Sequence, residues 1–300
     1  MKKGLWLALA TYLLWGVFPI YWKMLQHVPA MQLLGHRIVW SFATLLFVIL
    51  ITRQSHALRA KINGRVLLIY LAAAFLIGIN WLTYVWAVNA GFIVETSLGY
   101  FINPLLSVLL GTIILREHLR PWQWLPIGLA ASGVAYLTYT YGSLPWIALT
   151  LAFTFAIYGL VKKIAPLGSL YGLTLETGIL FLPALIYLTY AEWTGHAAFL
   201  HNGAPTDFLL IGAGLVTTVP LLLFASAARR IPLTMIGLMQ YISPTMQFLL
   251  GVLVYGEPFP PERAFGFGLV WIGLIVFWLE TFIHQSHARP ELIPKLVEGD

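Results

Sequence analysis

The chain contains no cysteine, which excludes disulfide bonds, thiol nucleophiles and cysteine-ligated metal sites. Charged residues are also scarce, at 9% of the 300 residues, whereas soluble domains carry about 25%. Hydrophobic residues make up 60% of the chain, and a soluble protein of this length has too little interior to bury so much apolar surface. The composition therefore predicts an integral membrane protein whose solvent is largely lipid.

The motifs of common enzyme classes are missing as well. The chain has no Gly-x-Ser-x-Gly element, no Walker loop and no His-Glu-x-x-His sequence. We therefore expect no enzyme activity, no cofactor and no metal site, so any uphill transport must draw on an ion gradient or on the gradient of the solute itself. The net charge of +6 does not indicate nucleic-acid binding, because the basic residues are scattered over short segments.

Apolar runs long enough to cross a bilayer recur along the whole chain. They predict an all-α integral membrane protein with ten transmembrane helices, over residues 4–24, 31–52, 66–89, 93–115, 122–141, 144–161, 168–190, 207–228, 232–255 and 263–283.

The loop charges support this number of helices. If the N-terminus is cytoplasmic, fourteen of the seventeen Lys and Arg residues lie in cytoplasmic segments. Such a bias is the usual orientation signal of membrane proteins. We therefore expect a multi-pass protein of the bacterial inner membrane, in contact with lipid, with both termini in the cytoplasm.

An internal repeat relates the two halves of the chain. Residues 99–133 align without a gap on residues 239–273, at an offset of 140. Because each half holds an odd number of predicted helices, the second half must enter the membrane upside down, as in many secondary transporters. The predicted division is a first five-helix repeat over 1–141, an inverted second repeat over 142–283 and a cytoplasmic tail over 284–300. The aligned identities include Pro104/Pro244, Gly111/Gly251, Glu117/Glu257, Pro121/Pro261, Gly128/Gly268 and Gly133/Gly273.

Arg37 is the most unusual residue of the predicted spans, about two turns inside the helix over 31–52. A charge at this depth is costly and generally faces the protein interior. Glu95, at a similar depth in the helix over 93–115, is its expected ion-pair partner. The alternative is that Arg37 reaches outward to the interface or bonds to a backbone carbonyl.

Glu176 lies 140 positions after His36, near mid-membrane in the predicted helix over 168–190. The nearest basic residues of that half, Lys162 and Lys163 among them, are expected at cytoplasmic helix ends, which would leave the carboxyl group without a partner. Burial favours the protonated form of an isolated carboxyl group, so a proton is a candidate coupling ion. The alternative is a structural role for a permanently protonated Glu176.

Further polar and aromatic residues recur at helical spacing and are candidates to line a cavity. The alternative for each is an ordinary contact between helices. Tryptophans near predicted helix ends, such as Trp22, Trp122 and Trp193, are instead expected in an interfacial belt. The predicted solute-binding residues are Trp15, Arg37, Asn80, Tyr84, Glu95, Tyr100, Asn103, Tyr158, Glu176, Gln240 and Gln247.

Several short runs make the chain resemble the EamA family of the drug/metabolite transporter superfamily, and within it the RarD-type, or chloramphenicol-sensitive protein, permeases. The resemblance extends over nearly the whole chain. It implies a permease that moves small organic molecules, usually outward, through a central cavity between the two halves. The runs are Trp15-Gly16, 18–23 (FPIYWK), 36–41 (HRIVWS), Asn80-Trp81, 84–89 (YVWAVN), 97–105 (SLGYFINPL), 175–177 (LET) and 240–245 (QYISPT).

These observations together favour a secondary transporter, acting as an exporter of amino-acid-like metabolites or drugs. Two other classes stay open from the sequence: a channel, and a non-transporting membrane protein such as a lipid-modifying enzyme or an assembly factor. An enzyme would need a catalytic cluster near one interface, and the sequence offers none.

Overall fold

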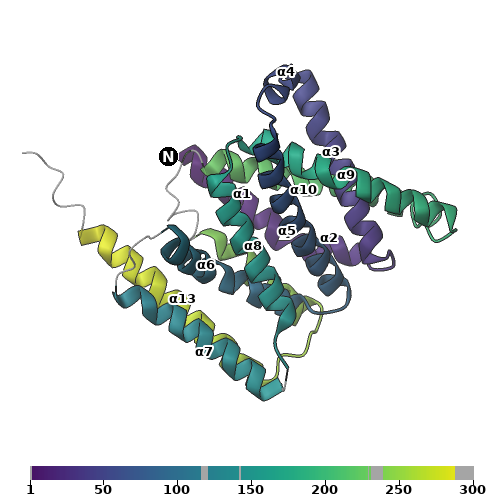
Figure 1. The fold of residues 1–300 in the computed structure, drawn as a ribbon. Helices are drawn as coiled ribbons and strands as arrows, with labels where there is room; N and C mark the ends of the chain where they lie inside the picture. The colour runs from purple at the N-terminus through teal and green to yellow at the C-terminus, as the bar shows by residue number, and fades with distance from the viewer. Residues whose placement is uncertain (1, 116–120, 142, 229, 231–238, 288–300) are drawn as a thin grey trace, which may run out of the picture. The chain divides into compact units, whose positions relative to one another are not determined.

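A computed structural model describes residues 2–115, 121–141, 143–228, 230 and 239–287 of the chain. Throughout these ranges the secondary structure is helical, without a β-strand (Figure 1). A helix satisfies its own backbone hydrogen bonds, which a lipid solvent requires. The predicted all-α membrane class is confirmed at this level, whereas the arrangement as two inverted repeats stays a prediction.

The chain divides into two compact units. The larger comprises Met1–Leu110 and Trp146–Pro258, and the smaller comprises Gly111–Pro145 and Phe259–Asp300. The larger unit contains α1 (Lys2–Gly16), α2 (Phe18–Met24), α3 (Ala30–Ile51), α4 (Ser55–Arg59), α5 (Gly64–Asn89), most of α6 (Ile93–Leu115), α8 (Trp146–Ile164), α9 (Ser169–Trp193), α10 (Ala204–Ala228), α12 (Ile242–Leu249) and the π-helix η2 (Leu250–Val254).

Helix α3 has a central place in the larger unit. It packs against α5, α9 and α10, while α5 also packs against α8 and α1 packs against α10 and α12 (Figure 1). Two glycines allow very close approaches between these helices. A Cβ atom added at Gly214 on α10 would lie 2.4 Å from the carbonyl carbon of Trp40 on α3, and one at Gly99 on α6 would lie 2.7 Å from the carbonyl oxygen of Ala148 on α8. Such small-residue contacts are typical of helix packing in membranes.

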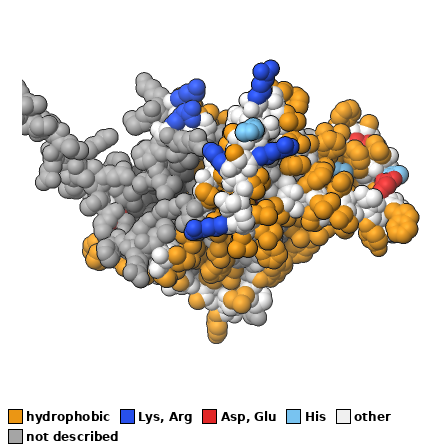
Figure 2. Space-filling model, turned by 45° about the horizontal axis from the view of Figure 1, so that its top comes forward, with side chains coloured by type: hydrophobic (Ala, Val, Ile, Leu, Met, Phe, Trp, Pro, Cys, Tyr) orange, Lys and Arg blue, Asp and Glu red, His pale blue; other side chains and the backbone are white. Residues whose placement is uncertain are grey.

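Several helices meet the requirements for crossing a bilayer. Within the described residues, the segments that are long and apolar enough are Lys3–Met24, Ala30–Ile51, Gly64–Asn89, Ser169–Trp193 and Ala204–Phe224. Trp146–Lys162 and Ile242–Val254 are shorter apolar helices. Large hydrophobic side chains such as Phe47, Leu68 and Leu182 are exposed, and Figure 2 shows hydrophobic side chains over much of the drawn face. These surfaces fit a lipid environment.

The helix predicted over 4–24 is broken into α1 and α2 at Val17, whose φ is −90° and ψ is 0°. Pro19, the second residue of α2, has no N–H and therefore cannot donate to the carbonyl of Trp15. That carbonyl instead accepts a hydrogen bond of 3.0 Å from Nε2 of Gln247 on α12. The proline thus creates a polar attachment point between two helices that are far apart in sequence.

The smaller unit is built on α7 (Trp124–Tyr141), α13 (Pro261–His287) and the 3-10 helix η1 (Pro121–Gln123), which pack together. The repeat glycine Gly133 sits at their contact, because an added Cβ atom would lie 2.7 Å from the carbonyl oxygen of Gly266. The helices predicted over 122–141 and 263–283 correspond to α7 and α13.

Some predicted features lie outside the described residues. They are the repeat residue Glu117, three of the basic residues expected in cytoplasmic segments (Arg116, Arg120 and Arg229), residues 232–238 of the predicted helix over 232–255, and residues 288–300 of the predicted tail.

Candidate functional site

Arg37 lies on α3 and is buried within the larger unit, with 4% of its surface exposed. Its Nε donates a hydrogen bond of 2.8 Å to Oγ1 of Thr217 on α10. Its guanidinium carbon lies 4.2 Å from the ring centroid of Trp81 on α5 and 5.2 Å from that of Trp22 on α2. In place of the predicted ion pair with Glu95, the structure gives Arg37 these contacts with α2, α5 and α10.

These contacts stabilise the guanidinium group without neutralising it. A desolvated cation–π contact contributes about 2 kcal/mol, and a hydrogen bond from a charged group contributes about 1.5–3 kcal/mol. The cost of an arginine at mid-membrane is about 2.5–3.5 kcal/mol on insertion scales and much more in simulations. The neighbours can therefore keep Arg37 in place, but its positive charge is left unbalanced by them.

We define the Arg37 cluster as Trp22, Arg37, Trp81, Tyr84 and Tyr100. Some of its buried polar atoms make no hydrogen bond within the described residues. Within the described residues, Nη1 of Arg37, Nε1 of Trp22 and the hydroxyl group of Tyr84 are buried without a hydrogen-bond partner. The rings of Tyr84 and Tyr100 pack edge to face with centroids 5.7 Å apart. Buried polar groups are normally paired, so unused atoms on three neighbouring residues make this cluster the candidate binding site.

The sequence does not predict the place of two residues beside Arg37. Trp22 was expected in the interfacial belt, but it is fully buried and its ring faces Arg37. The sequence does not single out Thr217. Its hydroxyl group reaches Arg37 because α10 packs against α3. No pattern in the sequence indicates that these two helices are neighbours. In contrast, Trp122 and Trp193 are exposed, as a belt requires.

Glu176 is not isolated, and this prediction is wrong. Its Oε1 lies 2.6 Å from Nζ of Lys162 on α8, and its Oε2 accepts a hydrogen bond of 2.8 Å from the hydroxyl group of Tyr158. The Lys162 side chain is 23% exposed and that of Glu176 is 1% exposed. Lysine has a long flexible stem, so a residue near a helix end reaches a carboxylate that the sequence places deeper.

Other predicted site residues make contacts between helices. Nδ2 of Asn80 donates to the carbonyl of Leu151 and to Oγ1 of Thr154 on α8, both at 3.0 Å. Trp15 and Gln247 are joined by the hydrogen bond described above. Asn103 is buried on α6, and Gln240 and Glu95 are half-buried. The structure thus brings Arg37, Tyr84 and Tyr100 together, places Tyr158 with Glu176, and puts Trp15 and Gln247 at the α1–α12 contact.

Glu257 has a structural role that the repeat alone did not explain. Its Oε1 accepts a hydrogen bond of 2.9 Å from the backbone N–H of Ile93, and its Oε2 accepts one of 2.8 Å from that of Val94. A carboxylate at the first turn of a helix satisfies free N–H groups and favours the helix dipole. The match of Glu117 with Glu257 across the repeat was the available signal for its importance.

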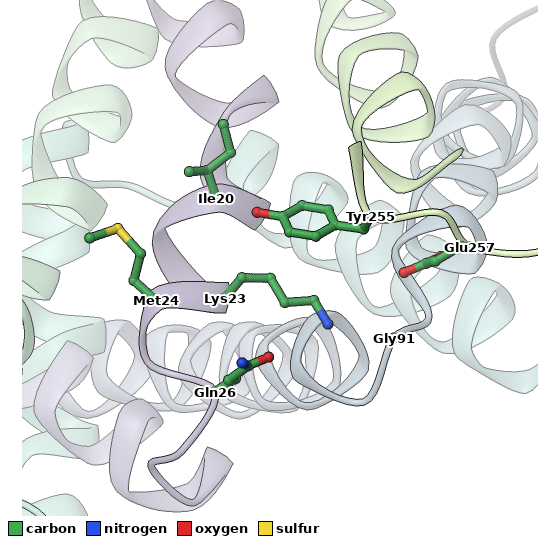
Figure 3. A pocket seen from close by; sticks show the side chains of 7 residues that line it. All are labelled: Ile20, Lys23, Met24, Gln26, Gly91, Tyr255 and Glu257. Atoms are coloured by element: carbon green, nitrogen blue, oxygen red, sulfur yellow. The ribbon is translucent and has the colours of Figure 1, made fainter. Parts of the chain in front are cut away.

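A cavity of about 390 Å³ lies beside this cap, between α2, the turn before α6 and the segment after η2 (Figure 3). It has an ammonium group from Lys23 and a carboxylate from Glu257 on its wall, and Lys23 Nζ lies 5.6 Å from the ring centroid of Tyr255. None of the predicted solute-binding residues lines it. The lining residues are Ile20, Lys23, Met24, Gln26, Gly91, Tyr255 and Glu257.

Comparison with known proteins places these features in a family. The EamA-like transporter family matches the chain over residues 2–139 and again over residues 144–279. The chain belongs to the EamA-like transporter family. It is therefore a multi-pass membrane protein of a transporter family.

EamA relatives are similar to this chain over most of its length. The "Uncharacterized transporter YojE" of Bacillus subtilis is 46% identical, with 92% of this chain and 93% of the relative covered. "Protein RarD" of Escherichia coli is 43% identical, with 95% and 96% covered. A solved crystal structure matches with a TM-score of 0.57 and 17% identity over 93% of this chain and 98% of its own, a likeness that concerns the fold alone.

Proposed function

We propose that the protein is a secondary transporter that exports small organic solutes, amino-acid-like metabolites or drug-like compounds, across the bacterial inner membrane. The observation that carries the proposal is the Arg37 cluster. It offers a buried cation and unused donors within the chain's main helical unit. Buried ionisable residues in membrane proteins generally mark a solute or ion path, and the relatives' printed names include transporters.

The proposed architecture is a pair of inverted five-helix repeats around this path. Three observations support it: the ungapped offset of 140 residues, the two separate ranges matched by the family, and the bias of basic residues toward one side. Figure 2 shows Lys and Arg side chains gathered on one part of the drawn face and Asp and Glu side chains elsewhere. With the N-terminus in the cytoplasm, the solute would enter from the cytoplasmic side.

Purified protein in liposomes tests this function. A panel of labelled amino acids and amphipathic drugs is supplied with and without an imposed pH gradient, and uptake is compared with that of protein-free liposomes. We expect saturable flux of at least one solute, and accumulation above equilibrium only when a gradient is imposed. Accumulation driven by the pH gradient would identify the proton as coupling ion.

Two results would contradict the proposal. Flux that rises linearly with solute concentration, without saturation or exchange between labelled and unlabelled solute, would indicate a channel. No flux above the protein-free control for any member of the panel, with the protein shown to be folded, would favour a non-transporting membrane protein.

A further inference from the structure

The guanidinium group of Arg37 carries a donor that the surrounding protein does not use. Nε is engaged by Thr217, whereas Nη1 is buried without an acceptor among the described residues. With 4% of its surface exposed, the side chain is also shielded from bulk water. An unused donor on a buried cation favours the entry of an acceptor from outside the chain.

The absence of a counter-charge beside Arg37, among the described residues, also favours an acceptor from outside the chain. Arg37 takes part in none of the ion pairs formed among the described residues, and the phenols of Tyr84 and Tyr100 near it are neutral at physiological pH. The buried carboxylate of the unit, Glu176, is engaged by Lys162 and Tyr158. A buried charge is costly without a counter-charge, so the missing partner of Arg37 should be an anion.

The hydrogen-bond donors around Arg37 indicate which class of anion fits the site. Nε1 of Trp22 and the hydroxyl group of Tyr84 are buried and unused, and they come from α2 and α5, while Arg37 comes from α3. Donors from three helices around one cation suit a group with more than one acceptor atom, and a carboxylate has two oxygens for charge-assisted hydrogen bonds.

The apolar part of the ligand follows from the rings of the cluster. Trp81 and Trp22 lie against the guanidinium group, and Tyr84 and Tyr100 pack edge to face beside it. Binding sites lined by aromatic side chains with a few placed polar groups favour ligands with a matching apolar body. The surroundings therefore suit a planar, apolar group attached to the anion.

We propose that Arg37 binds the carboxylate of an aromatic monocarboxylic acid, while the four rings of the cluster contact its apolar body. This inference rests on the transport function proposed above and names the substrate class of that site. Because Arg37 is enclosed, the helices that cover it must separate before the acid enters, as expected for a path that opens to one side at a time.

Calorimetric titration of the purified full-length protein, in detergent free of phospholipid, tests this assignment. The probes are benzoate, phenylacetate and indole-3-acetate, each paired with its neutral primary amide. We expect at least one acid to bind at least tenfold more tightly than its amide, a difference of about 1.4 kcal/mol. Arg37→Gln should abolish this preference. Tyr84→Phe, which keeps the ring and loses the donor, should reduce it severalfold.

The matched control is Arg65→Gln, which removes the same charge from an exposed position in the first turn of α5 and should leave the preference unchanged. Arg37→Lys covers the case in which Arg37→Gln does not fold, and it should weaken acid binding because lysine lacks the planar guanidinium fork. A thermal unfolding curve for every variant confirms that folded proteins are compared.

Three outcomes would overturn the assignment. All three acids could bind no better than their amides, the preference could persist in folded Arg37 variants, or chloride or inorganic phosphate could displace the acids at equal concentration. The last result would indicate a simple anion site without a place for an aromatic body. If any of these results is obtained while neutral solutes are still transported in liposomes, the acid-binding assignment fails and the transporter proposal does not. If the acids bind but no solute is transported, the transporter proposal fails and the assignment of the binding site does not.

Discussion

At the scale of single residues, the structure shows how a membrane protein accommodates charge. Arg37 and Glu176 are both buried, yet their surroundings differ. Glu176 has a counter-charge on Lys162, whereas Arg37 has aromatic rings and a neutral hydroxyl group. The first arrangement is complete within the chain, whereas the second leaves Nη1 of Arg37 without an acceptor among the described residues.

The Lys162–Glu176 pair should therefore act chiefly on stability. Lys162→Met leaves a buried carboxylate without its counter-charge and should reduce the free energy of unfolding by about 3 kcal/mol. Glu176→Gln should cost less, about 1 kcal/mol, because the lysine side chain is 23% exposed and can turn toward water. The double variant should recover much of the loss, as measured by unfolding in a double-mutant cycle. Equal, additive losses would contradict the pairing.

Residue depth was predictable from the sequence, but residue partners were not. Hydropathy and loop charge place Arg37 well inside a span, because both quantities report position along the bilayer normal. They say nothing about which helix faces which, and that information decides whether Arg37 meets Glu95 or Thr217. Trp22 shows the same limit, since its position near a helix end predicts the interface while its side chain turns inward onto α3.

At the scale of helices, packing distance is set by the smallest side chains. The helix ranges are largely predictable from the sequence, because each follows a long apolar run. The break at Val17 is an exception, since it lies within the apolar run over 4–24. The close contact of α3 with α10 depends on Gly214, at a spacing that admits no side chain. This contact also fixes Thr217, one turn further along α10, against Arg37.

Gly214→Ala should therefore destabilise the protein by about 1–3 kcal/mol, the usual cost of overpacking. Gly159→Ala on α8 is the matched control, because an added Cβ atom there meets nothing within 4 Å. It should be neutral or stabilise by up to about 1 kcal/mol, since alanine favours helix formation. Thermal unfolding of both variants in detergent checks the prediction, and equal midpoints would show that α3 and α10 can move apart at little cost.

At the scale of the whole molecule, the loop charges make a topological prediction. With both termini in the cytoplasm, reporter fusions after residues 58 and 290 should give cytoplasmic signals, and a fusion after residue 200 should give an external one. Residue 58 lies within the short helix α4, between α3 and α5, and residue 200 lies between α9 and α10. A cytoplasmic signal at residue 200 would exclude the ten-span arrangement.

The cap of Glu257 on α6 has a consequence for the rate at which the start of this helix opens. It joins residues from the two predicted halves by two charge-assisted hydrogen bonds, so separating the halves at this end requires both bonds to break in the same event. Each contributes about 1.5–3 kcal/mol, and the loss of one should shorten the lifetime of the capped arrangement by roughly ten- to a hundredfold. Glu257→Gln keeps one acceptor and removes the charge, so the amide protons of Ile93 and Val94 should exchange with solvent correspondingly faster. Unchanged exchange at both amides would mean that the barrier to opening lies elsewhere in the chain.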